Sequence, residues 1–292
     1  MTFRQHLTTL VAVFVALAVG IVLGGGLLSD VTEAASTEAS APAEETAPEA
    51  AYTESFTDAV APGLVAGRLT DRQVALVTVP GADEQVVTAL TERVAAAGGA
   101  VTARYDLTET MVGPDQKTLV DTLGSQLMTQ QGDAIAAEAT TYDRIGQLLG
   151  LAVATATPEG EATNGKGRAI LESLTGADLV GAPADVERRA PLVLLVLGDE
   201  PAAEGGDAIL AGLVTGLSRA AAGVVVAGDT GDGGEGQLGR LRAEPVSAEA
   251  ATVDGAETTA GQVTAVLALA RSLGTPGGAF GATGTDGPVP LG

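Results

Sequence analysis

An uncharged run of 22 residues, from Leu7 to Leu28, constrains this chain more than any other feature of its sequence. As a helix the run would be about 33 Å long, which is enough to cross a hydrocarbon core of about 30 Å. It is also longer than the apolar segment of an ordinary cleaved signal peptide. The sequence therefore predicts a membrane anchor over residues 1–29. A cleaved signal is the alternative, because Thr32 and Ala34 offer small residues for processing.

The large apolar residues of this run form the predicted membrane-contacting set. They are Leu7, Leu10, Val11, Val13, Phe14, Val15, Leu17, Val19, Ile21, Val22, Leu23, Leu27 and Leu28. Arg4 precedes the run, whereas residues 30–67 hold eight acidic residues and no lysine or arginine. This asymmetry predicts a single-pass protein of the cell membrane with a cytoplasmic amino terminus and an extracytoplasmic globular domain.

Residues 30–51 are low in complexity, with alanine, serine, threonine, glutamate and proline dominating. The segment lacks leucine, isoleucine and phenylalanine, so it cannot bury enough apolar surface to offset the entropy of ordering. Pro42 and Pro48 would also interrupt a continuous helix. We expect an acidic, flexible linker that does not self-associate.

Residues 52–273 alternate apolar β-branched runs with amphipathic helical patterns. The predicted strands are 73–79, 100–107, 192–197 and 223–227, and the predicted helices are 82–97, 115–128, 139–154, 168–174, 207–222 and 258–273. A short helix carrying Tyr52, Phe56 and Val60 comes first and is expected to end at Pro62-Gly63. The alternation predicts a three-layer α/β domain, Rossmann-like or flavodoxin-like, with a mostly parallel sheet of four to five strands. The Gly- and Pro-rich tail, residues 274–292, is expected to be loose.

The amino-acid composition excludes most classes of catalytic and metal-binding site. The chain has no cysteine, a single histidine (His6) and three methionines, which excludes disulfides, a Ser/His/Asp triad and thiolate metal sites. A net charge of −22 argues against nucleic acid and anionic lipid headgroups, which bind through clustered lysine and arginine. We expect no enzymatic activity, no cofactor, and no catalytic or metal-binding residues.

Two acidic segments could still carry a site. Residues 231–236 fit the pattern GxGxxG after an apolar strand, but Asp229, Asp232 and Glu235 would repel a pyrophosphate and no clear helix is predicted before Pro245. Weak calcium binding is an alternative for these carboxylates, although their spacing does not fit an EF-hand. Asp199-Glu200 follows a predicted central strand, where α/β sheets bind ligands, so this pair could serve acid/base catalysis.

Several segments resemble the actinobacterial MctB family of copper transport proteins. They are residues 3–6 leading into the uncharged run, 56–62, 64–69, 74–78, 223–228, Val253-Asp254 and 264–269. The resemblance covers nearly the whole chain and is most specific at the amino terminus. It implies an envelope location and a role in limiting intracellular copper. One member of the family is associated instead with envelope assembly and daughter-cell separation, acting with a membrane partner through a coiled coil.

Members of the family usually carry a heptad-patterned helix after the anchor, which residues 30–51 lack. Copper(I) prefers sulfur ligands, and the predicted exported part contains only Met111 and Met128. We therefore expect an indirect copper role for a membrane-embedded protein with a possible membrane partner or oligomer. A scaffold for envelope assembly is the alternative. A third possibility is an exported enzyme acting on sugar or peptidoglycan through carboxylates such as Asp199.

Overall fold

The computed structural model describes residues 47–200 and 205–290. The predicted anchor, with all its membrane-contacting residues, and most of the predicted linker lie outside these ranges. Within them, no helix combines the length and apolar character needed to cross a bilayer. Residues 51–292 form one compact unit, and residues 1–50 form the other unit of the chain.

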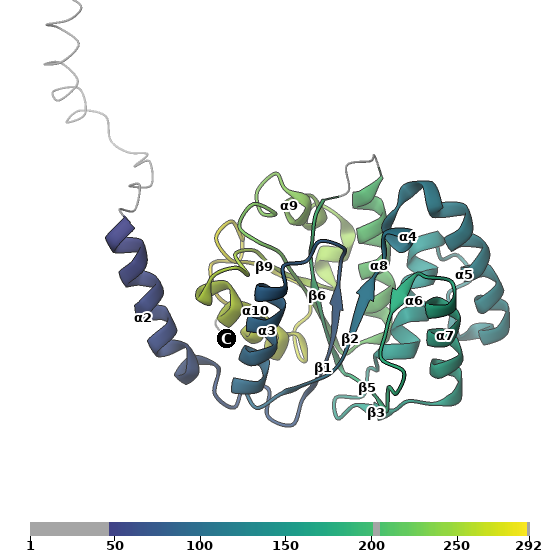
Figure 1. Cartoon of the computed structure of the whole chain (residues 1–292), viewed down its shortest axis with the longest axis horizontal. Coiled ribbons are helices and arrows are strands. Elements are labelled where there is room, and N and C mark those ends of the chain that lie inside the picture. The colour runs from purple at the N-terminus through teal and green to yellow at the C-terminus, as the bar shows by residue number, and fades with distance from the viewer. Residues whose placement is uncertain (1–46, 201–204, 291–292) are drawn as a thin grey trace, which may run out of the picture. The chain divides into compact units, whose positions relative to one another are not determined.

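A seven-stranded sheet runs through the compact unit, in the order β4-β2-β1-β6-β7-β8-β9 (Figure 1). Its strands are β1 (Gln73–Thr78), β2 (Ala100–Leu107), β4 (Val180–Gly181), β6 (Leu192–Val196), β7 (Gly223–Ala227), β8 (Ala251–Val253) and β9 (Ala279–Phe280). All neighbours pair in parallel except β4, which is antiparallel to β2. The α/β fold class and the mostly parallel sheet are thus confirmed.

The centre of the sheet is formed by the runs with the least charge. Every residue of β6 and β7 is buried, because helices cover both faces of the sheet. The chain goes from β1 outward to β2 and later returns to β6 on the other side of β1. This reversal between β1 and β6 is the place where open α/β sheets usually bind ligands.

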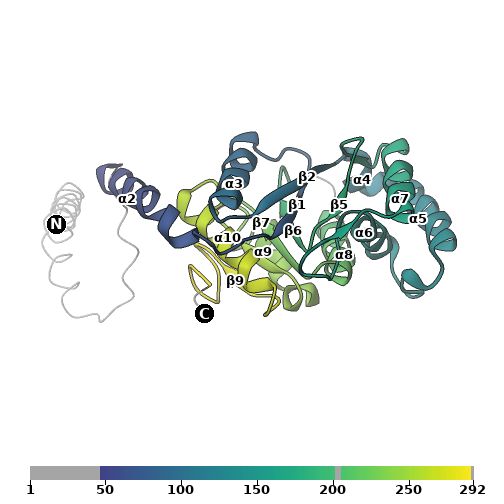
Figure 2. The same ribbon diagram turned by 90° about the horizontal axis from the view of Figure 1, so that it is seen from below.

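Helices lie on both faces of the sheet (Figures 1 and 2). One face packs against α3 (Glu84–Ala96) and α10 (Thr259–Ser272). The opposite face packs against α6 (Thr141–Val153) and α8 (Gly206–Ala220). Shorter or outer elements complete this second side: α4 (Glu109–Val112), η1 (Pro114–Gln116), α5 (Lys117–Gln131), η2 (Gly132–Ala134), α7 (Gly165–Gly176), α9 (Gln237–Arg242), η3 (Pro245–Ala248) and the small β3–β5 pair (Glu161–Ala162 with Arg188–Arg189).

Helices α6 and α8 run parallel at very close approach. A Cβ on Gly146 would lie 2.5 Å from the carbonyl oxygen of Leu213, and one on Gly216 would lie 2.3 Å from the carbonyl oxygen of Asp143. Only glycine allows two helix backbones to come this near. Both helices therefore begin at the same edge of the sheet, the edge at which the parallel strands end.

Helix α2 (Ala47–Val65) begins earlier and ends later than the sequence predicts. Its first residues belong to the predicted linker, so the helix begins before the predicted start of the globular part at residue 52. It also continues through Pro62, because Ala61 and Val65 are fully buried against the core and hold its last turn in place. Two further contacts reach the body: Thr259 donates its backbone N–H to Glu54 at 3.0 Å, and Arg93 pairs with Asp58 at 3.5 Å.

Two other expectations are wrong. The sheet has seven strands rather than four or five, since β4, β8 and β9 are only two or three residues long and leave no periodic pattern in the sequence. The tail after Gly274 is part of the fold, because β9 extends the sheet and pairs with β8.

Candidate functional site

A small cavity of about 250 Å³ lies at the carboxyl edge of the sheet, at the reversal between β1 and β6. The loops that follow β1, β6 and β7 form its walls. Four aspartates are among its lining residues: Asp83, Asp199, Asp229 and Asp232. The structure thus places Asp199 at one cavity with Asp229 and Asp232, although the sequence treated them as two separate candidates; Glu235 is not among the lining residues.

The loops after β1 and β6 pack directly on each other. A Cβ on Gly198 would lie 2.0 Å from the carbonyl oxygen of Pro80, so this approach requires glycine. The backbone N–H of Asp199 donates to the same carbonyl oxygen at 3.0 Å. Asp83 is the N-cap of α3 and accepts the backbone N–H of Gln85 at 2.7 Å. Asp83 therefore has a structural role as a helix cap.

Asp232 is the most perturbed group of this cavity. Partial burial raises its pKa to about 6, and the negative charges of Asp229, Glu200 and Glu257 act in the same direction. A hydrogen bond from the backbone N–H of Asp229 opposes this shift in pKa and holds the carboxylate at 2.9 Å. The described residues lining the cavity include no lysine or arginine. Such a cavity repels phosphates and other anions.

The glycine-rich loop leads directly into helix α9, so the expectation that no helix precedes Pro245 is wrong. This helix has only six residues, of which Leu238 and Leu241 are buried, and fewer than two turns are too short to give a clear periodic signal. The glycines permit close packing instead of phosphate binding: a Cβ on Gly239 would lie 1.8 Å from the carbonyl oxygen of Gly234.

Glu200 does not act together with Asp199. Its carboxylate pairs with Arg240 on α9, which also pairs with Asp207 on α8 at 2.8 Å. The carboxylate pair proposed for acid/base catalysis is thus divided: Asp199 lines the cavity, and Glu200 is held in an ion-pair cluster at its rim.

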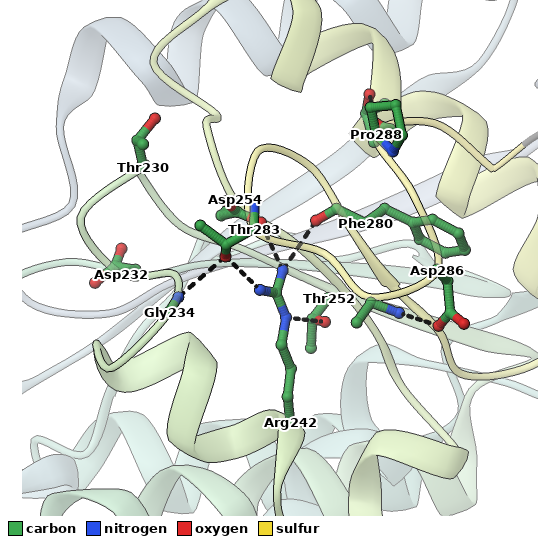
Figure 3. A network of polar contacts seen from close by, with 12 residues as sticks. Thr230, Asp232, Gly234, Arg242, Thr252, Asp254, Phe280, Thr283, Asp286 and Pro288 are labelled. Carbon is green, nitrogen blue, oxygen red and sulfur yellow. Dashed lines mark hydrogen bonds and ion pairs between the residues drawn. The ribbon is translucent and has the colours of Figure 1, made fainter. Parts of the chain in front are cut away.

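A buried polar network beneath α9 holds the carboxyl-terminal segment (Figure 3). The Arg242 guanidinium donates to Asp254 at 2.6 Å, Thr252 at 3.0 Å, Thr283 at 2.8 Å and the carbonyl of Phe280 at 2.9 Å. The other carboxylate oxygen of Asp254 accepts the backbone N–H of Thr283 at 2.8 Å. The Asp254 side chain is fully buried, and the positive charge of Arg242 compensates its negative charge.

Sequence reasoning recognised Val253-Asp254 only as a family-like segment and missed the partner of Asp254. Arg242 was the one available signal. The chain has few basic residues, so an arginine in this short segment indicates that an acidic residue lies close to it in the fold. The side-chain positions could not be paired without the fold.

The two methionine sulfurs do not form an exposed ligand pair. Met111 is fully buried in the core, and Met128 is packed against the same core cluster. Across the described ranges, no group of three or more histidine, cysteine, aspartate or glutamate side chains is arranged to hold a metal ion. The acidic cavity accordingly lacks the geometry of a recognisable metal centre.

Known proteins match this chain over nearly its entire length. Residues 1–290 match the family model described as "Copper transport outer membrane protein, MctB". Curated relatives from Mycobacterium bovis and from two strains of Mycobacterium tuberculosis, each named "Copper transporter MctB", are 25% identical over 287 residues, covering 92% of this chain and 91% of each relative. With nearly its entire length matched, the chain belongs to the MctB family.

Proposed function

We propose that this chain is a non-enzymatic, membrane-anchored envelope protein that takes part in copper homeostasis without coordinating copper itself. The copper role is supported by the names of the family and of its mycobacterial relatives. The family description also supports an envelope location. The predicted anchor at residues 1–29 and the acidic flank after it support a single-pass topology with a cytoplasmic amino terminus.

The burial of Met111 is the observation that carries the indirect role. Copper(I) is selected by thiolate and thioether ligands, and after the initiator the chain has only Met111 and Met128 as sulfur donors. Met111 on α4 is fully buried in the apolar core, and Met128 on α5 is partly buried against the same core, so coordination by both sulfurs would require part of the core to open. Beyond the predicted anchor, which holds His6, the remaining donors are oxygens such as carboxylates and backbone carbonyls, which are poor ligands for this ion.

Competition for copper(I) between the full chain and a chromogenic chelator tests this proposal. We expect no stoichiometric submicromolar site. Replacing Met128 with leucine conserves volume and apolar character, so Met128→Leu should leave copper tolerance of the cells unchanged. A tight stoichiometric site that disappears in Met128→Leu would refute the indirect role.

A scaffold role in envelope assembly is the second candidate, and helix α2 specifically favours it. Tyr52, Phe56, Val60 and Leu64 recur every four residues and form a solvent-exposed apolar stripe; Phe56, for example, is 57% exposed. The sequence identified the first three of these residues but not Leu64, and Ala61 and Val65 on the opposite face of the helix contact the core. An exposed apolar stripe of this kind is typical of a surface that binds another protein.

Substitutions on α2 and deletion of the gene separate the two roles. Phe56→Glu places a charge on the stripe, whereas Ser55→Glu places the same charge at an exposed position about 100° away around the helix. Under the scaffold role, Phe56→Glu reproduces the deletion phenotype and Ser55→Glu does not. Copper-sensitive growth of the deletion strain supports copper homeostasis, and chained, unseparated cells support the scaffold.

A further inference from the structure

A second and larger cavity, about 570 Å³, lies where α6 and α8 begin. Its walls are mostly apolar and include Pro114, Tyr142, Ala208 and Ile209, while Lys117 and Thr141 supply polar atoms. This volume is within the range of small-molecule sites, and an apolar lining with few polar groups is their usual composition.

The hydroxyl of Tyr142 is an unsatisfied polar group at this cavity. The residue is 7% exposed, and its hydroxyl oxygen is buried with no hydrogen-bond partner among the residues described. The Tyr142 Cβ packs against Gly212 of α8, and helical side chains tilt toward the amino terminus of their own helix. Tyr142 lines the cavity together with Ala208 and Pro114, but its hydroxyl oxygen is covered by neighbouring protein atoms, so a ligand reaches it only after the ring or those neighbours shift.

The pKa of Tyr142 fits this placement. Burial raises it, and the charge of Asp115, next to the lining residue Pro114, adds to the increase in pKa. A buried hydroxyl without a partner destabilises the folded protein, so such a group calls for an explanation such as a ligand.

Lys117 is a cation at this cavity that is not paired with a carboxylate of the described residues. It is one of two lysines in a chain of net charge −22, and it makes no ion pair within the described ranges. Its ammonium donates to Thr141 at 3.2 Å, and Thr141 in turn donates to Asp121 at 2.8 Å. Two of its three N–H groups thus remain for a ligand.

The helix ends at the cavity also lack side-chain caps. Thr140 precedes α6 without capping it, and Gly205 precedes α8 with no side chain to do so. By contrast, side chains of Asp83, Asn164 and Thr258 cap α3, α7 and α10. Uncapped first-turn N–H groups favour an acceptor, and preferably an anionic one.

We propose that this cavity binds a small carboxylate with an apolar body, whose carboxylate accepts hydrogen bonds from Lys117 and Tyr142. The apolar body would contact Pro114 and Ile209. Asp115 and Asp121 lie close by and oppose an anion, so the affinity is expected to be modest. The acidic cavity near Asp232 repels anions, which makes the two cavities chemically distinct.

Equilibrium dialysis of radiolabelled hexanoate against the purified full chain tests the proposal. We expect one equivalent to bind with a dissociation constant below about 1 mM. Hexanamide has the same shape and an acceptor oxygen but no charge, and should bind at least about tenfold more weakly. Acetate, which lacks the apolar body, should bind more weakly still.

Two pairs of matched variants locate the site. Lys117→Gln and Tyr142→Phe should each weaken hexanoate binding by about tenfold, since each removes a donor to the carboxylate. Lys166→Gln removes the other lysine, and Tyr105→Phe removes another buried hydroxyl without a partner, so both should bind like the unmodified chain.

Tyr142→Phe also separates binding from folding. Its hydroxyl has no partner in the described residues, so the variant should unfold at the same denaturant concentration or a higher one while it loses affinity. The proposal is overturned if no binding of hexanoate is detected at hexanoate concentrations of about 1 mM and above. It is also overturned if hexanamide binds equally well, or if Lys117→Gln leaves the affinity unchanged.

Discussion

Asp254 and Asp232 both follow parallel strands at the same edge of the sheet, yet the chain treats their charges in opposite ways. Asp254 is completely buried and bound by the guanidinium of Arg242. Asp232 is only partly buried, accepts a backbone N–H, and is surrounded by other carboxylates. The chain has 15 basic residues and 37 acidic ones, so most carboxylates have no cation available.

The difference indicates where this protein uses its few cations. Arg242 is placed where it joins β8, β9 and α9, and thereby fixes the carboxyl-terminal segment. The acidic cavity at the reversal of the sheet receives no such compensation from its described lining residues. Its carboxylates are only partly buried, so the protein folds without a cation to neutralise them. Their mutual repulsion and partial burial raise the pKa of Asp232.

Removing the buried cation should have the largest effect. Arg242→Met deletes four hydrogen bonds and leaves the buried Asp254 carboxylate unpaired. We expect the free energy of unfolding to fall by about 3 to 5 kcal/mol, measured by denaturant titration of the full chain.

Arg240→Met is the matched control on the same helix. Arg240 pairs with Glu200 and Asp207, which are both about half exposed, so its loss should cost at most about 1 kcal/mol. Equal losses for the two variants would contradict the special role assigned to Arg242.

An intermediate effect is expected where the tail meets Asp254. Gly281 has φ 107°, and a Cβ there would lie 2.4 Å from the backbone oxygen of Asp254. Gly287 has a similar φ of 105° but open space around it. Gly281→Ala should therefore destabilise the protein by about 1 to 3 kcal/mol more than Gly287→Ala, since only the first adds a steric clash to backbone strain.

Thermal or denaturant unfolding of the two glycine variants measures this difference. If both alanine variants lose the same stability, the tail does not pack tightly against Asp254. This result would contradict the conclusion that Asp254 is held more firmly than Asp232.

The smallest effect concerns Asp232 and depends on pH. Its pKa is about 6 in the folded protein and near 3.8 in the unfolded chain, so the native state holds the proton more tightly. The contribution of Asp232 to stability therefore falls as the pH rises from about 4 to about 6 and stays lower above that window. After allowance for solvent screening, Asp232→Asn should gain about 1 to 2 kcal/mol at neutral pH.

This gain should vanish below about pH 4, where both states of the unmodified chain carry the proton. Asp185→Asn, at an exposed site outside the cavity, is the control and should show no such trend. A gain that is independent of pH would mean that Asp232 does not carry the charge cost of the cavity.

The sequence predicted the parts of the fold that bury continuous apolar surface. The strands at β1, β6 and β7 stand out because they carry almost no charge, and α10 stands out because its apolar residues repeat over four turns. Strand β9 has two residues and α9 has six, so neither is long enough to show a period. They form because the Arg242 network holds them, and that network joins residues up to 41 positions apart.

The candidate sites were predictable only in part. Asp199 and Asp232 were found because both follow apolar strands, and the strand order then brought their loops together. Lys117 and Tyr142 gave no signal, since each looks like an ordinary residue near the start of a helix. Their proximity depends on the packing of α5 against α6, which is a tertiary contact that no local pattern encodes.

The glycine contacts between α6 and α8 have a consequence for hydrogen exchange. Two helices whose backbones nearly touch cannot separate by small steps, so they should open as one cooperative unit together with the strands beneath them. We expect backbone amides in the middle of α6, α8 and β6 to exchange with solvent only through global unfolding. Amides of α2, which touches the body at few points, should exchange orders of magnitude sooner.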